Sequence, residues 1–131
     1  MRKNYSTNTP WEGLVGYSRA VQVGQHIHVS GTTATNREGK IVEANDPYLQ
    51  TVQIITNIES ALKAFNANLK DVIRTRIYVA NMDHWEQIAK AHHEFFGEVR
   101  PAATIVEVSR FISPEILIEI EADAFIGCLE L

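Results

Sequence analysis

Hydrophobic and polar residues alternate in some segments of the chain and follow a three- or four-residue spacing in others. Alternation over residues 17–23 and 26–31 predicts two strands, and Gly24 begins a two-residue sequence between them that fits a tight hairpin turn. In this register Arg19 faces Ser30 across the two strands. Because cross-strand partners lie on the same side of a sheet, we expect both side chains on one face.

Two segments carry apolar residues at helical spacing. The first helix is expected to begin at Pro47, with Asp46 as its N-cap, and to end near Asn66. The second is expected to begin after Asn81 or Asp83. Its apolar stripe consists of Trp85, Ile88, His92 and Phe95.

Three further strands are predicted over residues 72–79, 104–108 and 116–126, while the first fifteen residues or so form a polar lead-in. The even positions of the last strand are all apolar. Its odd positions include Glu119, Glu121 and Asp123. The order strand-strand-helix-strand-helix-strand-strand indicates an α+β domain in which two helices cover the apolar face of a mixed sheet.

The other face of this sheet is expected to be unusually rich in charge. It would carry Arg19, His28, Ser30, Arg74, Arg76, Tyr78, Glu119, Glu121 and Asp123. Charges of both signs on one face indicate either a solvated surface, which antiparallel sheets often have, or an interface where the charges pair. In the second interpretation this face closes against other copies of the chain and lines a polar cleft.

Composition narrows the class of protein. The chain has 131 residues, of which 45% are hydrophobic and 21% charged, and this is typical of one globular domain over residues 1–131. A net charge of −4 gives no basic footprint for nucleic acid, and the short apolar runs predict no membrane span. The single cysteine, Cys128, excludes an intramolecular disulfide. Without a signal-peptide pattern, the expected location is the cytoplasm.

Short motifs recur through nearly the whole chain in a specific order. They are GYSRAV (16–21), VSGT (29–32), LKDVIR (69–74), FF (95–96), RPAATIVEV (100–108) and IEIEA (118–122). Together they resemble the RidA (YjgF-type) family of reactive-intermediate deaminases. The resemblance implies a chorismate-mutase-like α+β fold, a homotrimer whose sheets form a central barrel, and small-molecule clefts between neighbouring subunits. It also implies hydrolysis of enamines and imines to keto acids and ammonia without metal or organic cofactor.

The chain departs from that family at the position that binds the substrate carboxylate. Active members carry an arginine as the third residue of a P-A-R motif, whereas Pro101-Ala102-Ala103 places alanine there. Alanine cannot supply a bidentate guanidinium, and the loss of two charge-assisted hydrogen bonds forfeits roughly 3–6 kcal/mol of binding. Ala89 and His92 also stand where active members usually have asparagine and tyrosine. The chain therefore resembles the arginine-less branches of the family.

The resemblance also suggests which residues form the site. Glu121 aligns with the glutamate that holds the attacking water, for which general-base help contributes about 10²- to 10⁴-fold; an ion pair with Arg74 or Arg76 is the alternative. Tyr17 and Ser30 align with residues that line the cleft. Their alternatives are packing for the tyrosine and a hydrogen bond to nearby backbone for the serine.

Two further side chains are candidates. Arg19 replaces a glutamine of the family motif, and we hypothesise that it binds an anion near the position vacated at Ala103; pairing with Glu121 or another carboxylate is the alternative. His92 is either a core or interface residue or a proton shuttle. It cannot chelate a metal together with His93, because neighbours on a helix point about 100° apart. Two functions stay open: a cofactor-free hydrolase that uses Glu121, and a non-catalytic small-molecule-binding module.

Overall fold

The computed structural model describes residues 1–127, so Cys128 lies outside the described residues. The strands are β1 (Arg2–Tyr5), β2 (Ala20–Val23), β3 (His26–Thr32), β4 (Val72–Val79), β5 (Ala102–Glu107) and β6 (Ile118–Phe125). The helices are α1 (Pro10–Val15), α2 (Pro47–Lys63) and α3 (Trp85–Phe96), with short 3₁₀ turns at Leu69–Asp71 and Met82–His84.

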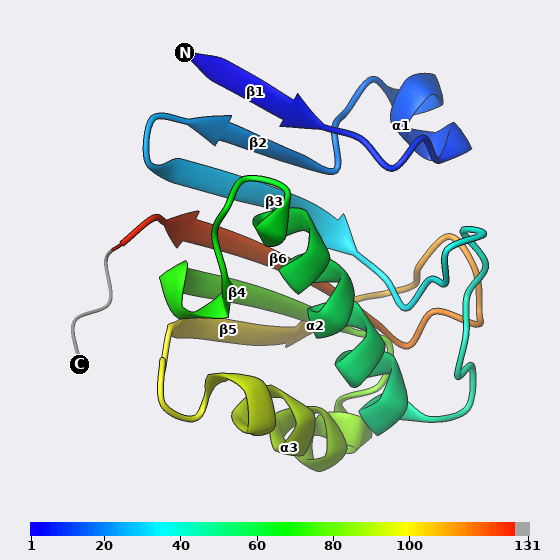
Figure 1. Cartoon of the computed structure of the whole chain (residues 1–131). Helices are drawn as coiled ribbons and strands as arrows, with labels where there is room; N and C mark the ends of the chain where they lie inside the picture. The colour runs from blue at the N-terminus through cyan, green and yellow to red at the C-terminus, as the bar shows by residue number, and fades with distance from the viewer. Residues whose placement is uncertain (128–131) are drawn as a thin grey trace.

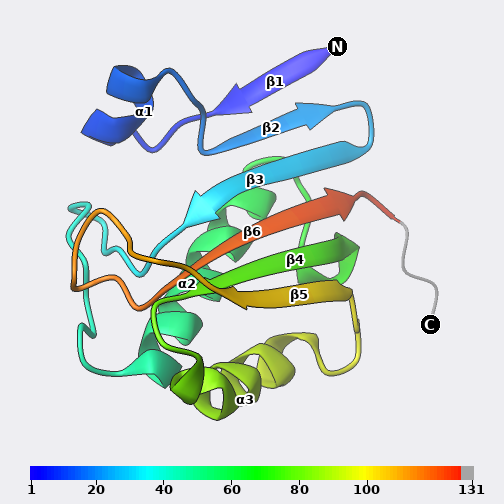
Figure 2. The same cartoon turned by 180° about the vertical axis from the view of Figure 1, so that it is seen from behind.

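The strands form one six-stranded mixed sheet in the order β1-β2-β3-β6-β4-β5. Only the β4–β5 pair at one edge is parallel, and the other described pairs are antiparallel. Helices α2 and α3 cover one face of the sheet (Figure 1), and the view from behind shows the strands in front of both helices (Figure 2). This arrangement confirms the predicted α+β layers.

Helix α2 begins where the sequence predicts. The Asp46 carboxylate accepts a hydrogen bond from the backbone N–H of Leu49 at 2.9 Å, and Pro47 occupies the first turn. The helix buries a row of apolar side chains against β3 and β6. That row includes Ile54, Ile55, Ile58 and Leu62, all with 0% exposure. Each such burial stabilises the fold by about 1.5–3 kcal/mol.

Helix α3 buries a slightly different stripe from the one expected. Ile88 is fully buried as predicted, but Trp85 is 52% exposed and Phe96, not Phe95, is the aromatic side chain in the core. The 3₁₀ turn before Trp85 has Asn81 as its cap, with the Asn81 side chain accepting from the N–H of Asp83 at 2.9 Å. The helix therefore begins later than Asn81, and its first residue stays near solvent.

The polar lead-in contains two elements that the sequence pattern does not predict. Strand β1 pairs with β2, with Arg2 opposite Val23 and Tyr5 opposite Ala20, and α1 follows it. The three polar residues at the start of β1 are exposed, which is common in edge strands and leaves no hydrophobic alternation to detect. Regular pairing in β2 begins at Ala20, although the backbone oxygen of Arg19 still accepts from the N–H of Ser30 at 3.0 Å.

The face opposite the helices carries the expected charges, and we call it the charged sheet face. Strand pairing sets His28 opposite Asp123, Arg76 opposite Glu121 and Tyr78 opposite Glu119. The predicted hairpin register is confirmed. The remaining members of the charged sheet face are Arg19, Ser30 and Arg74. No helix in the described range 1–127 is long and apolar enough to cross a membrane.

Candidate functional site

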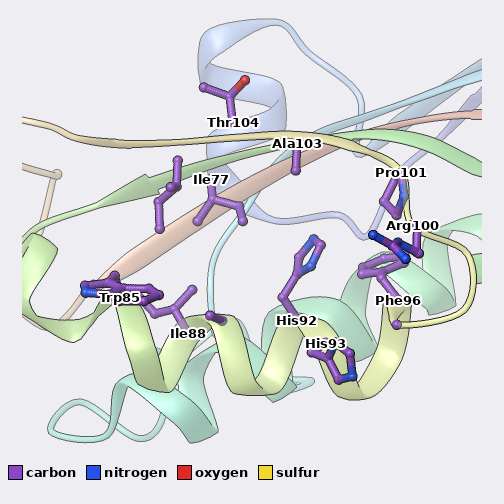
Figure 3. A pocket seen from close by; sticks show the side chains of 13 residues that line it. Ile77, Trp85, Ile88, His92, His93, Phe96, Arg100, Pro101, Ala103 and Thr104 are labelled. Atoms are coloured by element: carbon purple, nitrogen blue, oxygen red, sulfur yellow. The ribbon is translucent and has the colours of Figure 1, made fainter.

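The candidate residues fall into two groups on opposite sides of the sheet. Tyr17, Arg19, Ser30 and Glu121 belong to the charged sheet face or adjoin it. Ala103 pairs with Thr75 across β4 and β5, on the side that faces α3. His92 extends from α3 toward the same strand (Figure 3). One copy of the chain therefore does not bring all of these residues together.

Arg19 organises the first group. Its Nη2 donates a hydrogen bond to the backbone oxygen of Gly31 at 2.6 Å, and its guanidinium carbon lies 5.5 Å from the centre of the Tyr17 ring. This ring contact has the geometry of a cation–π interaction. The Ser30 hydroxyl donates to the backbone oxygen of Ser18 at 2.7 Å. Tyr17, Arg19 and Ser30 are thus fixed at one end of the charged sheet face.

Glu119 joins this group, although sequence reasoning selected Glu121 instead. Burial raises the pKa of Glu119, nearby Arg19 lowers it, and Glu121 adds a further increase. The Glu119 side chain occupies the space that Gly31 leaves by having no side chain. In the sequence, Glu119 is one of three acidic residues at the odd positions of β6, and the alternation does not show that it lies beside a glycine. The contact with Gly31 of the neighbouring strand β3 distinguishes Glu119 from the other two.

Glu121 has a different partner. Its Oε1 accepts a hydrogen bond from the Tyr78 hydroxyl at 2.6 Å, and this bond raises the pKa of Tyr78. Arg76 instead donates to Asp123 at 2.9 Å, and Nδ1 of His28 lies 2.8 Å from the other Asp123 oxygen. The two glutamates on β6 therefore differ in environment. Glu121 accepts a hydrogen bond from the Tyr78 hydroxyl, whereas Glu119 lies near the Arg19 guanidinium.

The second group lines a pocket of about 690 Å³ between α3 and β5, which we call the α3–β5 pocket (Figure 3). Its size is typical of small-molecule sites. Its apolar lining comes mainly from Ile77, Trp85, Ile88, Phe96, Ala103 and Ile105. The short Ala103 side chain leaves room beneath β5 where a longer residue would intrude.

His92 is the central polar group of this pocket. Its Nε2 lies 3.0 Å from the hydroxyl of the fully buried Thr75, and its ring centre lies 4.7 Å from that of Phe96. Burial lowers the pKa of His92, and the neighbouring His93 lowers it further. His92 is therefore a neutral hydrogen-bonding group at pH 7, held in place by Thr75, a residue that the sequence pattern did not single out.

The arrangement does not form a metal centre. Among residues 1–127, no three histidine, cysteine, aspartate or glutamate side chains come together as metal ligands. His26 and His28 stack on the charged sheet face with ring centres 6.5 Å apart, and His28 is bound to Asp123. The chemistry that these residues offer is proton transfer and hydrogen bonding.

Comparison with known proteins identifies the family. A family model described as endoribonuclease L-PSP matches residues 8–126. A RutC family protein of Pyrococcus horikoshii is 36% identical over 122 residues, which cover 92% of this chain and 94% of that protein. A protein of Streptomyces coelicolor is 32% identical over 128 residues, which cover 98% of this chain and 95% of that protein.

The fold agrees with this assignment. A crystal structure from Mycobacterium tuberculosis, of a member of the YjgF/YER057c/UK114 family, matches with a TM-score of 0.88 and 40% sequence identity. The match covers 96% of this chain and all of that one. The chain belongs to the endoribonuclease L-PSP family, which is the RidA (YjgF-type) family that its motifs resemble.

Proposed function

We propose that the chain associates with copies of itself as a trimer and hydrolyses small enamines or imines without metal or organic cofactor. The cleft would form between the charged sheet face of one copy and the α3–β5 pocket of the next. The observation that carries this proposal is the division of the site into two incomplete halves. The carboxylates lie on one side of the sheet, and the pocket lies on the other.

The edge strand β5 supports association. All of its residues are exposed in the single chain, and Ile105 and Val106 place apolar side chains on its two faces. An exposed apolar edge strand is a liability that proteins usually cover. A second copy is the occupant that best fits, because the adjoining charged sheet face carries both signs of charge. Its charges can pair with opposite charges of the next copy when the copies close head to tail into a ring.

The two glutamates of β6 suit the two proton transfers of the reaction. Glu121 would accept a proton from water as the water oxygen bonds to the imine carbon. Glu119, whose raised pKa favours the protonated form, would donate a proton to the nitrogen. In the resulting carbinolamine the protonated Glu121 gives its proton to the amine nitrogen, the C–N bond breaks to release ammonia, and the hydroxyl proton passes to the ionised Glu119. A carbonyl compound remains, and both carboxyl groups are back in their starting states. The sum is imine plus water to carbonyl compound plus ammonia.

The name of the family model refers to RNA cleavage, but RNA does not fit this site well. Recognition of RNA depends on cationic surfaces that neutralise phosphates. This chain has a net charge of −4, and its candidate site combines an apolar pocket with two carboxylates. We therefore favour a small molecule. A non-catalytic binding module on the same scaffold is the second candidate, because Ala103 lacks the arginine that active relatives use.

Ammonia release separates the two candidates. The substrates are 2-aminoacrylate and a carboxylate-free imine, both generated in situ, and the variants are Glu121→Gln and Glu119→Gln. Turnover above the spontaneous rate that falls about 10²- to 10⁴-fold in Glu121→Gln supports the hydrolase. Glu38→Gln, on an exposed loop, is the matched control and is expected to keep full activity. Ketone binding without turnover of any substrate would identify a binding module instead.

A further inference from the structure

The α3–β5 pocket contains a cation that the proposed reaction leaves without a role. Arg100 lines the pocket at the end formed with Phe96 and Pro101, while Trp85 lies at the opposite end (Figure 3). Among the described residues that line this pocket, Arg100 alone carries a permanent charge, and no carboxylate faces it from the lining. In the sequence, Arg100 stands out only as the first residue of the motif RPAATIVEV (100–108).

The backbone of Arg100 gives no reason for an arginine. Its φ of 53° lies in the left-handed region, and its N–H donates to the backbone oxygen of Phe96 at 2.8 Å, which closes the turn after α3. Glycine is the usual residue at such a position after a helix. Non-glycine residues in this conformation are uncommon and cluster at functional sites. Asn8, Glu43 and Asn66 also adopt it, so the backbone does not require an arginine at this position.

The charge of Arg100 has no partner within the described part of the chain. No hydrogen bond or ion pair of its guanidinium is found among residues 1–127. The same is true of Arg37 and Arg110, but these two lie on exposed loops and do not line the pocket. Three arginines of the charged sheet face are bound. Arg19 donates to Gly31, Arg74 to Thr104 and Arg76 to Asp123. An unpaired guanidinium beside an apolar pocket is suited to bind a carboxylate in a bidentate manner.

We propose that Arg100 is the anion-binding residue of the α3–β5 pocket, and that its ligand is amphipathic. The ligand would have an apolar or aromatic body lying among Trp85, Ile77 and Ile88, and a carboxylate at the Arg100 end. This assignment rests on the proposed function for the identity of the pocket as the substrate site. The substrate class is then an enamine or imine of a keto acid with a bulky apolar side chain.

The position of Arg100 relative to Ala103 supports this ligand shape. Arg100 lies three residues before Ala103, at the end of the pocket. The proposed anion site therefore lies at this end, and not at Ala103 on β5, where active relatives have their arginine. The space beneath Ala103 is then free for the body of the ligand, next to the neutral His92. A small keto acid such as pyruvate would reach Arg100 but would leave the apolar lining unfilled, and it should bind weakly.

Binding of two matched ketones tests the proposal without requiring turnover. Phenylpyruvate and phenylacetone share the same aromatic body and ketone, and only phenylpyruvate has a carboxylate. Calorimetry on the intact protein should show phenylpyruvate binding about ten- to a hundredfold more tightly, as expected for one charge-assisted contact. In Arg100→Gln this preference should disappear through weaker phenylpyruvate binding, while phenylacetone binding stays unchanged.

Two further variants control for folding and for charge. Arg100→Gly removes the side chain at a backbone position that glycine adopts without strain, so it is expected to fold and to lose the same preference. Arg37→Gln removes a charge from an exposed loop and should retain it. An unchanged preference in both Arg100 variants would overturn the proposal, and so would equal binding of the two ketones by the native chain. Weaker self-association of these variants with an unchanged preference would assign Arg100 to the contact between copies and would equally overturn it. Failure of ammonia release alone would contradict the proposed hydrolysis and leave this binding test intact.

Discussion

The Glu119 side chain fills the space that Gly31 leaves free because it has no side chain. A Cβ atom at residue 31 would lie 2.5 Å from Oε2 of Glu119, well inside van der Waals contact. The contact joins β3 to β6 at the place where their pairing shifts between Val29 and Thr32. The position of the Glu119 carboxylate, and with it the cluster around Arg19, therefore depends on the absence of a side chain at residue 31.

Replacing Gly31 by alanine should displace Glu119. The added methyl group forces the flexible end of the Glu119 side chain away from its present rotamer, and we expect a loss of about 0.5–1.5 kcal/mol in the free energy of unfolding. Gly13→Ala is the matched control, because nothing lies within 4 Å of a Cβ at that position. Urea unfolding of both variants measures the difference. Equal stability of the two variants would show that the Glu119 side chain can move away from the added methyl group without loss of stability.

Arg19→Gln should move the alkaline limb of the pH–rate profile to higher pH. Arg19 lowers the pKa of Glu119 while burial raises it, so loss of the guanidinium leaves burial and Glu121 to raise this pKa further. Glu119 acts in its protonated form in the proposed reaction, so activity that depends on it should persist to a higher pH in the variant. The kcat/KM profile of the variant is the measurement. An unshifted profile would remove Glu119 from the titrating groups of the reaction.

Thr75→Val should lower the free energy of unfolding by removing the hydrogen-bond partner of His92. Valine has the shape of threonine without the hydroxyl, so the variant leaves Nε2 of the partly buried His92 without its partner at 3.0 Å. Loss of such a partner costs about 1–3 kcal/mol. Chemical unfolding measures the cost, and Thr56→Val on an exposed turn of α2 is the control. A stability like that of the control would mean that water or another group replaces the hydroxyl.

The N-terminal segment should respond to acid through Glu12. Burial alone would raise the pKa of Glu12, but hydrogen bonds from Thr7, Ser6 and Thr9 outweigh it and lower the pKa from 4.5 to about 2. The folded state therefore binds a proton less readily than the unfolded state. Its stabilisation by Glu12 is complete above pH 4.5 and is lost as the pH falls toward 2.

Glu12→Gln is the variant that tests this pH dependence. The shift in pKa corresponds to about 3 kcal/mol at neutral pH, and the variant should lack that share of stability. Its stability should also change less than that of the native chain between pH 4.5 and 2. Unfolding curves across this range provide the measurement. Parallel losses in both proteins would place the acid sensitivity elsewhere in the fold.

Local patterns were sufficient to predict much of the fold. The Asp46-Pro47 start of α2, the turn after β2 and the alternation of β6 are encoded by neighbouring residues, and all are confirmed. Strand β1 escaped prediction because its exposed polar residues carry no alternation. The parallel pairing of β4 with β5 depends on contacts far apart in the sequence, and no local pattern specifies it.

The candidate site was only partly predictable for the same reason. The register of the hairpin was enough to place Arg19 beside Ser30. The difference between Glu119 and Glu121 arises from side chains on other strands, namely Gly31 and Tyr78. The alternation of β6 could not distinguish the two glutamates; only the family resemblance selects Glu121, and the roles of both stay predictions. The hypothesis that Arg19 serves the position of Ala103 also stays a prediction, and it requires a second copy of the chain.

Activity of mixed assemblies tests most directly whether the site forms between copies. Glu121→Gln removes a carboxylate from one half, and Ala103→Trp fills the pocket of the other half, so each variant alone should be inactive. When the two are unfolded, mixed equally and refolded together, about one quarter of the sites should combine two intact halves. Recovery of about a quarter of the native ammonia release, in assemblies that sedimentation shows to be trimers, is the predicted result. No recovery in such trimers, or sedimentation as single chains only, would contradict the account.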